Sequence, residues 1–316
     1  MSDKNNDQIT IPDTHANKRL DQAVAMLAPE YSRTQIQTWI EAGSILVNGK
    51  QCKAKMKVRG GEIVSFHLIK QETLHWEGEN IPLNIVHEDD ALLIVNKPVG
   101  MVVHPGAGNL HHTLLNALLH YCSSLRSLPR AGILHRLDKD TSGLIVIAKT
   151  AAALKNLSSQ LKKRTLLREY QAIIYGKLIS GGTIEAPISR HPLQRKRMAI
   201  IETGKNAITY YRIAEKYRAH TRLIIRLETG RTHQIRVHMA SIHHPIVGDM
   251  VYGRIQLTKG MKPELIQFLR QFKRQALHAF ALGLTHPLTQ HFVRWEVELP
   301  QDMKTLIQLL KEDMLP

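Results

Sequence analysis

The segment Gly132-Ile-Leu-His-Arg-Leu-Asp-Lys-Asp-Thr-Ser-Gly143, followed by Leu144-Ile-Val-Ile-Ala148, decides how this chain folds. Residues 144–148 carry no polar side chain, so they predict a central strand that is buried on both faces. The preceding loop is polar and has a glycine at each end, where the backbone can turn sharply. A loop that carries Arg136, Asp138 and Asp140 and is anchored on a buried strand is typical of a rigidly held functional site.

Two simpler interpretations of this loop stay open at this point. Asp138 and Asp140 could be turn formers, with Arg136 as their surface partner. Asp-x-Asp-x-Ser-Gly also resembles part of a calcium loop. That motif needs a bidentate acid at its twelfth position, where this chain has Lys149, so calcium is not expected.

Composition limits the possible functions. The chain has 316 residues, which suggests about two domains, and its 43% of hydrophobic residues can form a sizeable core. A net charge of +16 favours a polyanionic partner, and nucleic acid is the better candidate because no apolar run approaches the length of a membrane span. The polar N-terminus lacks the apolar stretch of a signal peptide, so we expect a cytoplasmic protein.

Neither a cofactor nor a metal is expected. The glycine-containing segments match neither a dinucleotide fingerprint nor a phosphate-binding P-loop. Cys52 and Cys122 are far apart in sequence, which excludes a disulfide framework and a zinc cluster. The 18 histidines show no metal-site spacing supported by cysteine or acid.

The first part of the chain predicts a small basic unit. Residues 1–16 are polar and predict a disordered tail, and a compact unit over residues 17–75 follows. Apolar spacing predicts two helices, and Asn48-Gly49 predicts a tight hairpin turn. We interpret the basic side chains here as phosphate contacts rather than as an ordinary solvated face. They are Arg33, Lys50, Lys53, Lys55, Lys57 and Arg59.

The remainder predicts a linker over residues 76–84 and a second domain over residues 85–316. This domain is expected to contain both strands and helices. The strands are expected near residues 91–95, 144–148, 168–175, 222–227 and 292–297. The helices are expected after Thr150, from Pro263 and over 302–312. Basic residues gather in the loop 181–206 and near residue 231. RNA contacts are therefore expected from Arg190, Arg195, Lys196, Arg197 and Arg231.

The order of residues in His135-Arg-Leu-Asp-x-x-Thr-Ser-Gly143 resembles the signature of the RluA-type pseudouridine synthases. Asn96-Lys97-Pro98, Arg168-Glu169-Tyr170 and Leu227 to Arg236 also match this family, and residues 17–75 resemble the S-four-type RNA-binding module. The resemblance implies a mixed α/β catalytic domain on a mainly antiparallel sheet. It also implies an isomerase that converts uridine to pseudouridine in RNA without a cofactor.

The resemblance also implies roles for individual residues. Asp138 is the catalytic aspartate, and Arg236 is the cation that pairs with it. Tyr170 stacks on the uracil ring or assists proton removal from C5, although a buried strand tyrosine is the simpler interpretation. Arg136 enters the space left by the target base, rather than forming a loop salt bridge with Asp140. Whether Asp138 attacks the sugar or acts otherwise stays open.

The expected substrate is 23S ribosomal RNA of the large subunit, bound by a monomer. Within the family the likeness is greatest to the D branch, which makes the helix 69 stem-loop the first candidate, and the C branch is the alternative. A catalytically silent RNA-binding ribosome-assembly factor is the rival from another class. Asp138, Tyr170 and Arg236 favour the enzyme, because a protein that only binds RNA has no need of these three side chains.

Overall fold

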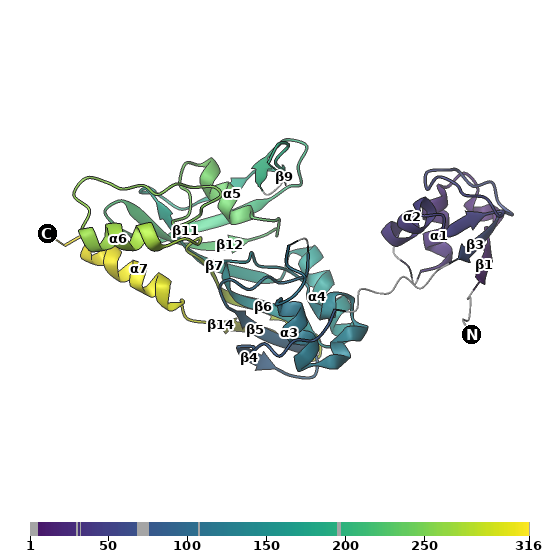
Figure 1. The fold of residues 1–316 in the computed structure, drawn as a ribbon, viewed down its shortest axis with the longest axis horizontal. Helices are drawn as coiled ribbons and strands as arrows, with labels where there is room; N and C mark the ends of the chain where they lie inside the picture. The colour runs from purple at the N-terminus through teal and green to yellow at the C-terminus, as the bar shows by residue number, and fades with distance from the viewer. Residues whose placement is uncertain are drawn as a thin grey trace. The chain divides into compact units, whose positions relative to one another are not determined.

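The computed structural model describes residues 6–29, 31, 33–67, 76–106, 108–194 and 197–315. The chain forms two compact units, Met1–His75 and Trp76–Pro316 (Figure 1). Both mix helices with mainly antiparallel strands, which confirms the predicted fold class. No helix in the described ranges is long and apolar enough to cross a membrane.

The small unit packs two helices against a three-stranded antiparallel sheet. In sheet order its strands are β1 (Asn6–Thr10), β3 (Ile63–His67) and β2 (Ile45–Val47), and its helices are α1 (Leu20–Leu27) and α2 (Arg33–Glu41). Leu20, Val24, Ile36 and Ile40 are fully buried, as their helical spacing predicts. The apolar faces of both helices therefore form the core of this unit.

The predicted hairpin turn at Asn48-Gly49 is confirmed. Both residues have positive φ, 48° and 74°, which is the backbone conformation that a two-residue hairpin turn of this type requires. Val47 and Lys50 exchange backbone hydrogen bonds of 2.9 and 3.0 Å across the turn. The chain segment with the alternating lysines begins directly after it.

The N-terminal segment differs from the disordered tail that the sequence predicted. Strand β1 pairs with β3 from Asn6 opposite His67 to Thr10 opposite Ile63, and Ile11 is fully buried in the core of the small unit. The prediction is therefore wrong for residues 6–16, because backbone hydrogen bonds to a sheet edge can order a segment whose side chains are mostly polar. Residues 1–5 lie outside the described residues.

The large unit is built on one nine-stranded sheet. In sheet order its strands are β4 (Ile85–Glu88), β5 (Leu92–Lys97), β6 (Ser142–Ala148), β13 (Leu277–Thr285), β7 (Leu167–Tyr175), β12 (His220–Leu227), β11 (Ile208–Lys216) and β8 (Gly182–Glu185), and β14 (Phe292–Glu296) also pairs with β13. The β6–β13 pairing is parallel, and the others are antiparallel.

The other elements of this unit flank the sheet (Figure 1). The helices are α3 (Leu114–Tyr121), α4 (Ala151–Lys163), α5 (Gln234–Ser241), α6 (Pro263–Gln271) and α7 (Gln301–Glu312), with short 3-10 helices at Ser123–Ser127 and Pro129–Gly132. A separate two-stranded hairpin consists of β9 (Ile188–Arg190) and β10 (Met198–Ile200), inside a region that the sequence predicted as loop.

Strand β6 is the buried central strand that the sequence predicted. All seven of its residues are buried. Ile145 and Ile147 pack in a cluster with α3, whereas Leu144 and Val146 pack in another with α4, so both faces are covered. Gly143 has φ of 115°, and a Cβ at this position would lie 2.2 Å from the carbonyl oxygen of Ala279 on β13. Close approach of β13 therefore requires glycine here.

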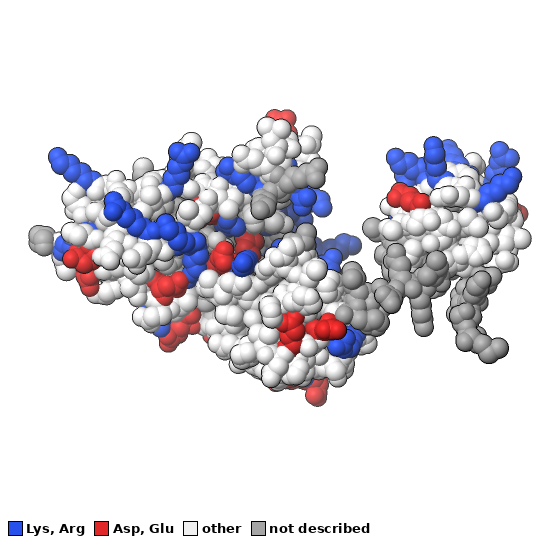
Figure 2. Space-filling view, in the orientation of Figure 1, with Lys and Arg blue, Asp and Glu red and all other residues white. Residues whose placement is uncertain are grey.

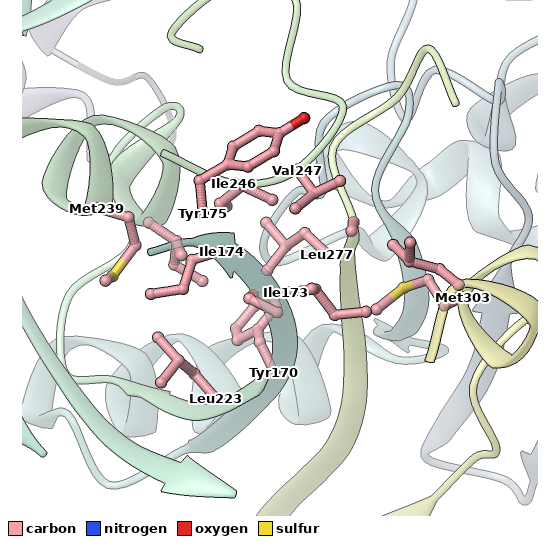
Figure 3. Packing of buried hydrophobic residues seen from close by; sticks show 14 of the residues in the cluster. Tyr170, Ile173, Ile174, Tyr175, Leu223, Met239, Ile246, Val247, Leu277 and Met303 are labelled. Atoms are coloured by element: carbon pink, nitrogen blue, oxygen red, sulfur yellow. The ribbon is translucent and has the colours of Figure 1, made fainter. Parts of the chain in front are cut away.

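A further cluster of buried side chains in the large unit combines residues of the strands β7, β12 and β13 with residues of the helices α5, α6 and α7. Figure 3 shows Tyr170 and Ile173 of β7 in this cluster together with Leu223 of β12 and Leu277 of β13. Tyr170 thus belongs partly to the hydrophobic core, and the large cluster fixes the strand that carries it.

Residues 76–84 differ from the predicted linker. Trp76 and Leu83 pack against the cluster formed by α3 and β6, and Glu79 donates its backbone N–H to the carbonyl oxygen of Asn116. These residues therefore belong to the large unit. Residues 68–75 lie outside the described residues.

Candidate active site

The loop before β6 is held by a buried lysine. Lys97 at the end of β5 is fully buried, and its ammonium group donates hydrogen bonds to the carbonyl oxygens of Pro98, Met101 and Lys139 at 2.8, 2.9 and 3.0 Å. An ammonium group has three donors, so all are used. Burial lowers the pKa of Lys97 to about 7. The contact with Lys139 fixes the backbone next to Asp138.

The end of the same loop is held by side chains of β13 and of the segment that precedes β13. Gln275 donates a 2.9 Å hydrogen bond to the hydroxyl of Thr141, and the Ser142 hydroxyl lies 2.8 Å from Nδ1 of His278 on β13. All four side chains are buried. The part of the loop that directly follows Asp138 is therefore anchored at Lys139, Thr141 and Ser142, as a precisely placed functional group requires.

Asp138 is paired with Arg236, although the two residues are 98 positions apart in sequence. Nη1 of Arg236, on α5, donates a 3.0 Å hydrogen bond to Oδ2 of Asp138. Nε and Nη2 of the same guanidinium donate to Asp249 at 2.7 and 2.9 Å. Burial alone would lower the pKa of Arg236, but the two carboxylates outweigh burial and raise that pKa. Arg236 is thus a permanent cation.

The two carboxylates differ in how much of their hydrogen-bonding capacity is used. Asp249 is buried, and its Oδ1 also accepts from the backbone N–H groups of Val251 and Tyr252. The Asp138 side chain is 16% exposed, and its Oδ1 accepts no hydrogen bond from the described part of the chain. Nε2 of His233 faces that oxygen at 3.9 Å, which is too far for a hydrogen bond. One oxygen of Asp138 is therefore free for a ligand.

Tyr170 and Arg168 lie on the same face of β7, two residues apart. Tyr170 is 5% exposed, and burial raises the pKa of its phenol, so the phenol is protonated at neutral pH. Arg168 is buried as well, and its Nη2 donates to the carbonyl oxygen of Glu228 at 3.3 Å. Burial has the largest effect on the pKa of this phenol, whereas the charge of Arg168 lowers that pKa and the charge of Asp138 raises it.

His233 and Tyr252 also belong to this site, and the sequence analysis assigned a catalytic role to neither side chain. His233 precedes α5 with φ of 55°, and its Nδ1 lies 2.8 Å from the Tyr252 hydroxyl. The Tyr252 ring faces the guanidinium groups of Arg236 and Arg197, at 5.1 and 5.3 Å from its centroid. The sequence analysis assigned no role to the turn that carries Tyr252.

Among the described side chains of the large unit that were predicted to bind RNA, two are exposed and two are partly exposed. Arg136 is exposed and has no hydrogen bond or ion pair with the described residues, so the alternative loop salt bridge with Asp140 is not formed. Arg190 is exposed on β9, and Arg231 is partly exposed while its Nε donates to the carbonyl oxygen of Asn206. Arg197 is partly exposed and faces the ring of Tyr252. Arg195 and Lys196 lie outside the described residues.

In the small unit Arg33 differs from the lysines in its contacts within the protein. Arg33 donates two hydrogen bonds, of 2.9 and 3.0 Å, to the buried carboxylate of Asp21, so its guanidinium is partly engaged within the protein. Lys50, Lys53 and Lys55 are exposed. Figure 2 shows Lys and Arg side chains gathered on one face of this unit. Such a surface suits a polyanion.

Comparisons with known proteins give the class to which this fold and site belong. The family model described as RNA pseudouridylate synthase matches residues 91–241, and the S4 domain model matches residues 18–64, in the S-four-type module. The chain is 52% identical to "Ribosomal large subunit pseudouridine synthase D" of Escherichia coli (strain K12), over 96% of this chain and 94% of that protein. The chain therefore belongs to the RNA pseudouridine synthase family, as its resemblance implied.

Other relatives agree with this assignment. A protein of the same name from Pasteurella multocida (strain Pm70) is 51% identical, over 94% of this chain and 92% of that protein. The solved structure of human RNA pseudouridylate synthase domain containing 1 covers 76% of this chain and 98% of its own, with 25% identity and a TM-score of 0.53. Human RNA pseudouridylate synthase domain containing 4 covers 72% and 93%, with 22% identity and a TM-score of 0.56, which supports the fold.

Membership in this family makes the chain an isomerase that converts uridine in RNA to pseudouridine. The S4 domain adds an RNA-binding module. No group of three or more side chains that could hold a metal ion occurs among the residues described.

Proposed function

We propose that this protein isomerises specific uridines of 23S ribosomal RNA, in the large subunit or its precursor. The names of the relatives that are 52% and 51% identical support this substrate class. The net charge of +16 and the S4 domain fit a large RNA. The helix 69 stem-loop is the first candidate site, and other uridines of the same RNA, as in the C branch, are the alternative.

The observation that carries the mechanism is the contact between Arg236 and Asp138. Pseudouridine formation breaks the bond between C1′ and N1 of uridine, turns the base and joins C5 to C1′, and the proton leaves C5 while N1 gains one. Arg236 fixes Oδ2 of Asp138 and leaves Oδ1 open. We infer that this open oxygen acts at the sugar, either as a nucleophile or by stabilising charge at C1′.

Tyr170 acts on the uracil ring in this proposal. Its phenol is protonated at neutral pH, so it suits stacking directly, and it can move a proton only if a base accepts the phenolic hydrogen. Tyr170→Phe should keep measurable turnover if the ring stacks on uracil, and Tyr170→Leu should lose most of it. If the phenol moves the C5 proton, both variants should be inactive.

The remaining predicted residues bind RNA. The exposed guanidinium of Arg136, without a partner in the described residues, takes the place of the extruded base. Phosphate contacts come from Arg190, Arg195, Lys196, Arg197 and Arg231 in the large unit and from Arg33, Lys50, Lys53 and Lys55 in the small unit. We further propose a cytoplasmic monomer that works without a cofactor, so activity should survive a chelator once RNA folding is otherwise supported.

The central test compares Asp138→Asn with the wild type. The measurement is release of tritium from C5-labelled uridine in ribosomal RNA, with RNA binding measured alongside. We expect no release and unchanged or tighter RNA binding, because a negative charge near a polyanion is removed. Wild-type release by this variant would contradict the mechanism. Mapping pseudouridine in 23S RNA from cells without the gene then separates helix 69 from other sites, and an unchanged map would favour the silent assembly factor.

A further inference from the structure

We propose that Tyr252 is a positioning residue that links the β9–β10 hairpin to the catalytic carboxylate. Its hydroxyl fixes the orientation and tautomer of His233 opposite Asp138, and its ring holds the guanidinium of Arg236. The placement of the hairpin on RNA thereby sets the geometry of Asp138. This inference rests on the proposed function, and it concerns how the site is assembled rather than which bonds it changes.

The direction of the hydrogen bonds follows from their donors. The backbone N–H of Met198, on β10, can only donate, so the Tyr252 hydroxyl accepts its 2.7 Å hydrogen bond. The phenolic hydrogen then points to Nδ1 of His233 at 2.8 Å, since this nitrogen is the other polar group in contact with the hydroxyl in the described structure. Nδ1 is therefore the acceptor, and the proton of neutral His233 resides on Nε2.

This tautomer directs an N–H group at the free oxygen of Asp138. Nε2 of His233 and Oδ1 of Asp138 are 3.9 Å apart, so a small movement of either group, or a substrate hydroxyl between them, completes the interaction. Burial lowers the pKa of His233, which favours the neutral form that Tyr252 requires. The charged groups that act on His233 are Asp138, Arg236, Asp249 and Arg136.

The ring of Tyr252 provides a second link. It lies 5.1 Å from the guanidinium of Arg236 and 5.3 Å from that of Arg197, within the range of cation–π attraction. Arg236 holds Asp138, and Arg197 lies next to β10. Side chains of the hairpin and of α5 also share one small hydrophobic cluster with Tyr252, which contains Ile188, Met198 and Val237. Phosphate contacts at the hairpin therefore act directly on the surroundings of Tyr252.

The first test is Tyr252→Phe, which keeps the ring and removes both hydrogen bonds of the hydroxyl. With saturating 23S RNA, single-turnover isomerisation should fall about tenfold. The loss of the donor to Nδ1 favours imidazolium, so the pKa of His233 should rise, and the acid limb of the rate profile should move to higher pH. Tyr217→Phe is the matched control, because it removes a buried phenol hydrogen bond to Glu215 that is not part of this site. It should leave rate and profile unchanged.

The second test separates binding from positioning and does not alter Tyr252. Arg197→Gln should lower the single-turnover rate at saturating RNA as well as RNA affinity. Arg190→Gln, on the same hairpin but without contact to Tyr252 in the described structure, should lower affinity alone. Equal behaviour of these two variants, or a wild-type rate and pH profile for Tyr252→Phe, would overturn the link. An active Asp138→Asn variant would instead overturn the proposed function, so the two failures are distinguishable.

Discussion

The loop over residues 135–143 and the turn over residues 248–253 each present an aspartate to the same guanidinium, yet the two regions are built for different tasks. Asp249 is fully buried and accepts hydrogen bonds from Arg236 and from two backbone N–H groups. Asp138 is partly exposed and accepts from Arg236 alone in the described structure. The bidentate pair with Asp249 anchors the arginine, and the remaining nitrogen aims Asp138.

A charge that is buried and fully paired is costly to leave alone, whereas a partly exposed charge can be hydrated when its partner is removed. Substitutions at the two carboxylates should therefore separate stability from activity. Urea denaturation measures the loss in the free energy of unfolding, and tritium release measures the loss of activity.

Arg236→Met should have the largest effect, because it removes the partner of both carboxylates. The buried charge of Asp249 is then left with backbone donors only, and we expect a loss of about 4 kcal/mol in the free energy of unfolding. Isomerisation should be abolished as well. Arg270→Met, at an exposed position on α6, is the matched control and should change stability by less than about 0.5 kcal/mol. A wild-type denaturation midpoint for Arg236→Met would remove the anchoring role of the pair.

Asp249→Asn keeps the shape of the side chain but removes its charge. We expect a loss of about 2–3 kcal/mol, since Arg236 stays buried with only Asp138 as its counter-charge. Isomerisation should fall about 100-fold, because a guanidinium without its bidentate anchor no longer aims Asp138 accurately. Both quantities can be followed in one preparation by denaturation and tritium release. A variant with full activity but reduced stability would show that Asp138 is aimed by other contacts.

Asp138→Asn should reduce activity far more than it reduces stability. Its side chain is 16% exposed and holds one hydrogen bond from Arg236, so stability should change by less than about 1 kcal/mol although isomerisation is lost. Asp138→Glu should also be inactive, because the added methylene displaces the carboxylate by about 1 Å. A large loss of stability in Asp138→Asn would mean that the two carboxylates are equally structural.

Asp140→Asn should have the smallest effect and a defined pH dependence. Burial lowers the pKa of Lys97 to about 7, and the charge of Asp140 opposes this lowering. The attraction exists only while Lys97 is protonated in the folded protein, so it stabilises the fold below about pH 7 and is lost as pH rises through that value. We expect a loss below about 1 kcal/mol at pH 6 and none at pH 9. Equal losses at both values would show that the Asp140 side chain stabilises the fold independently of the charge of Lys97.

Many local elements could be predicted from the sequence because their causes lie within a few residues. The apolar run 144–148 became the buried strand β6, Thr150 caps α4 by accepting from the N–H of Ala153, and Asn48-Gly49 forms the hairpin turn. The ordered strand β1 was missed, because its stability comes from pairing with residues 63–67 and not from its own composition.

The candidate site could likewise be predicted in part from the sequence, and the tertiary structure decided the rest. The order of residues in the motifs alone determined the family and pointed to Asp138, Tyr170 and Arg236, whose catalytic roles remain a proposal. Only the tertiary structure placed Arg236 between two carboxylates and brought Tyr252 and His233 to Asp138. The contact between Asp138 and Arg236 joins residues that are 98 positions apart, and the order of strands in the sheet and the packing of α5 against it decide whether such residues meet. No local pattern of side chains carries that information.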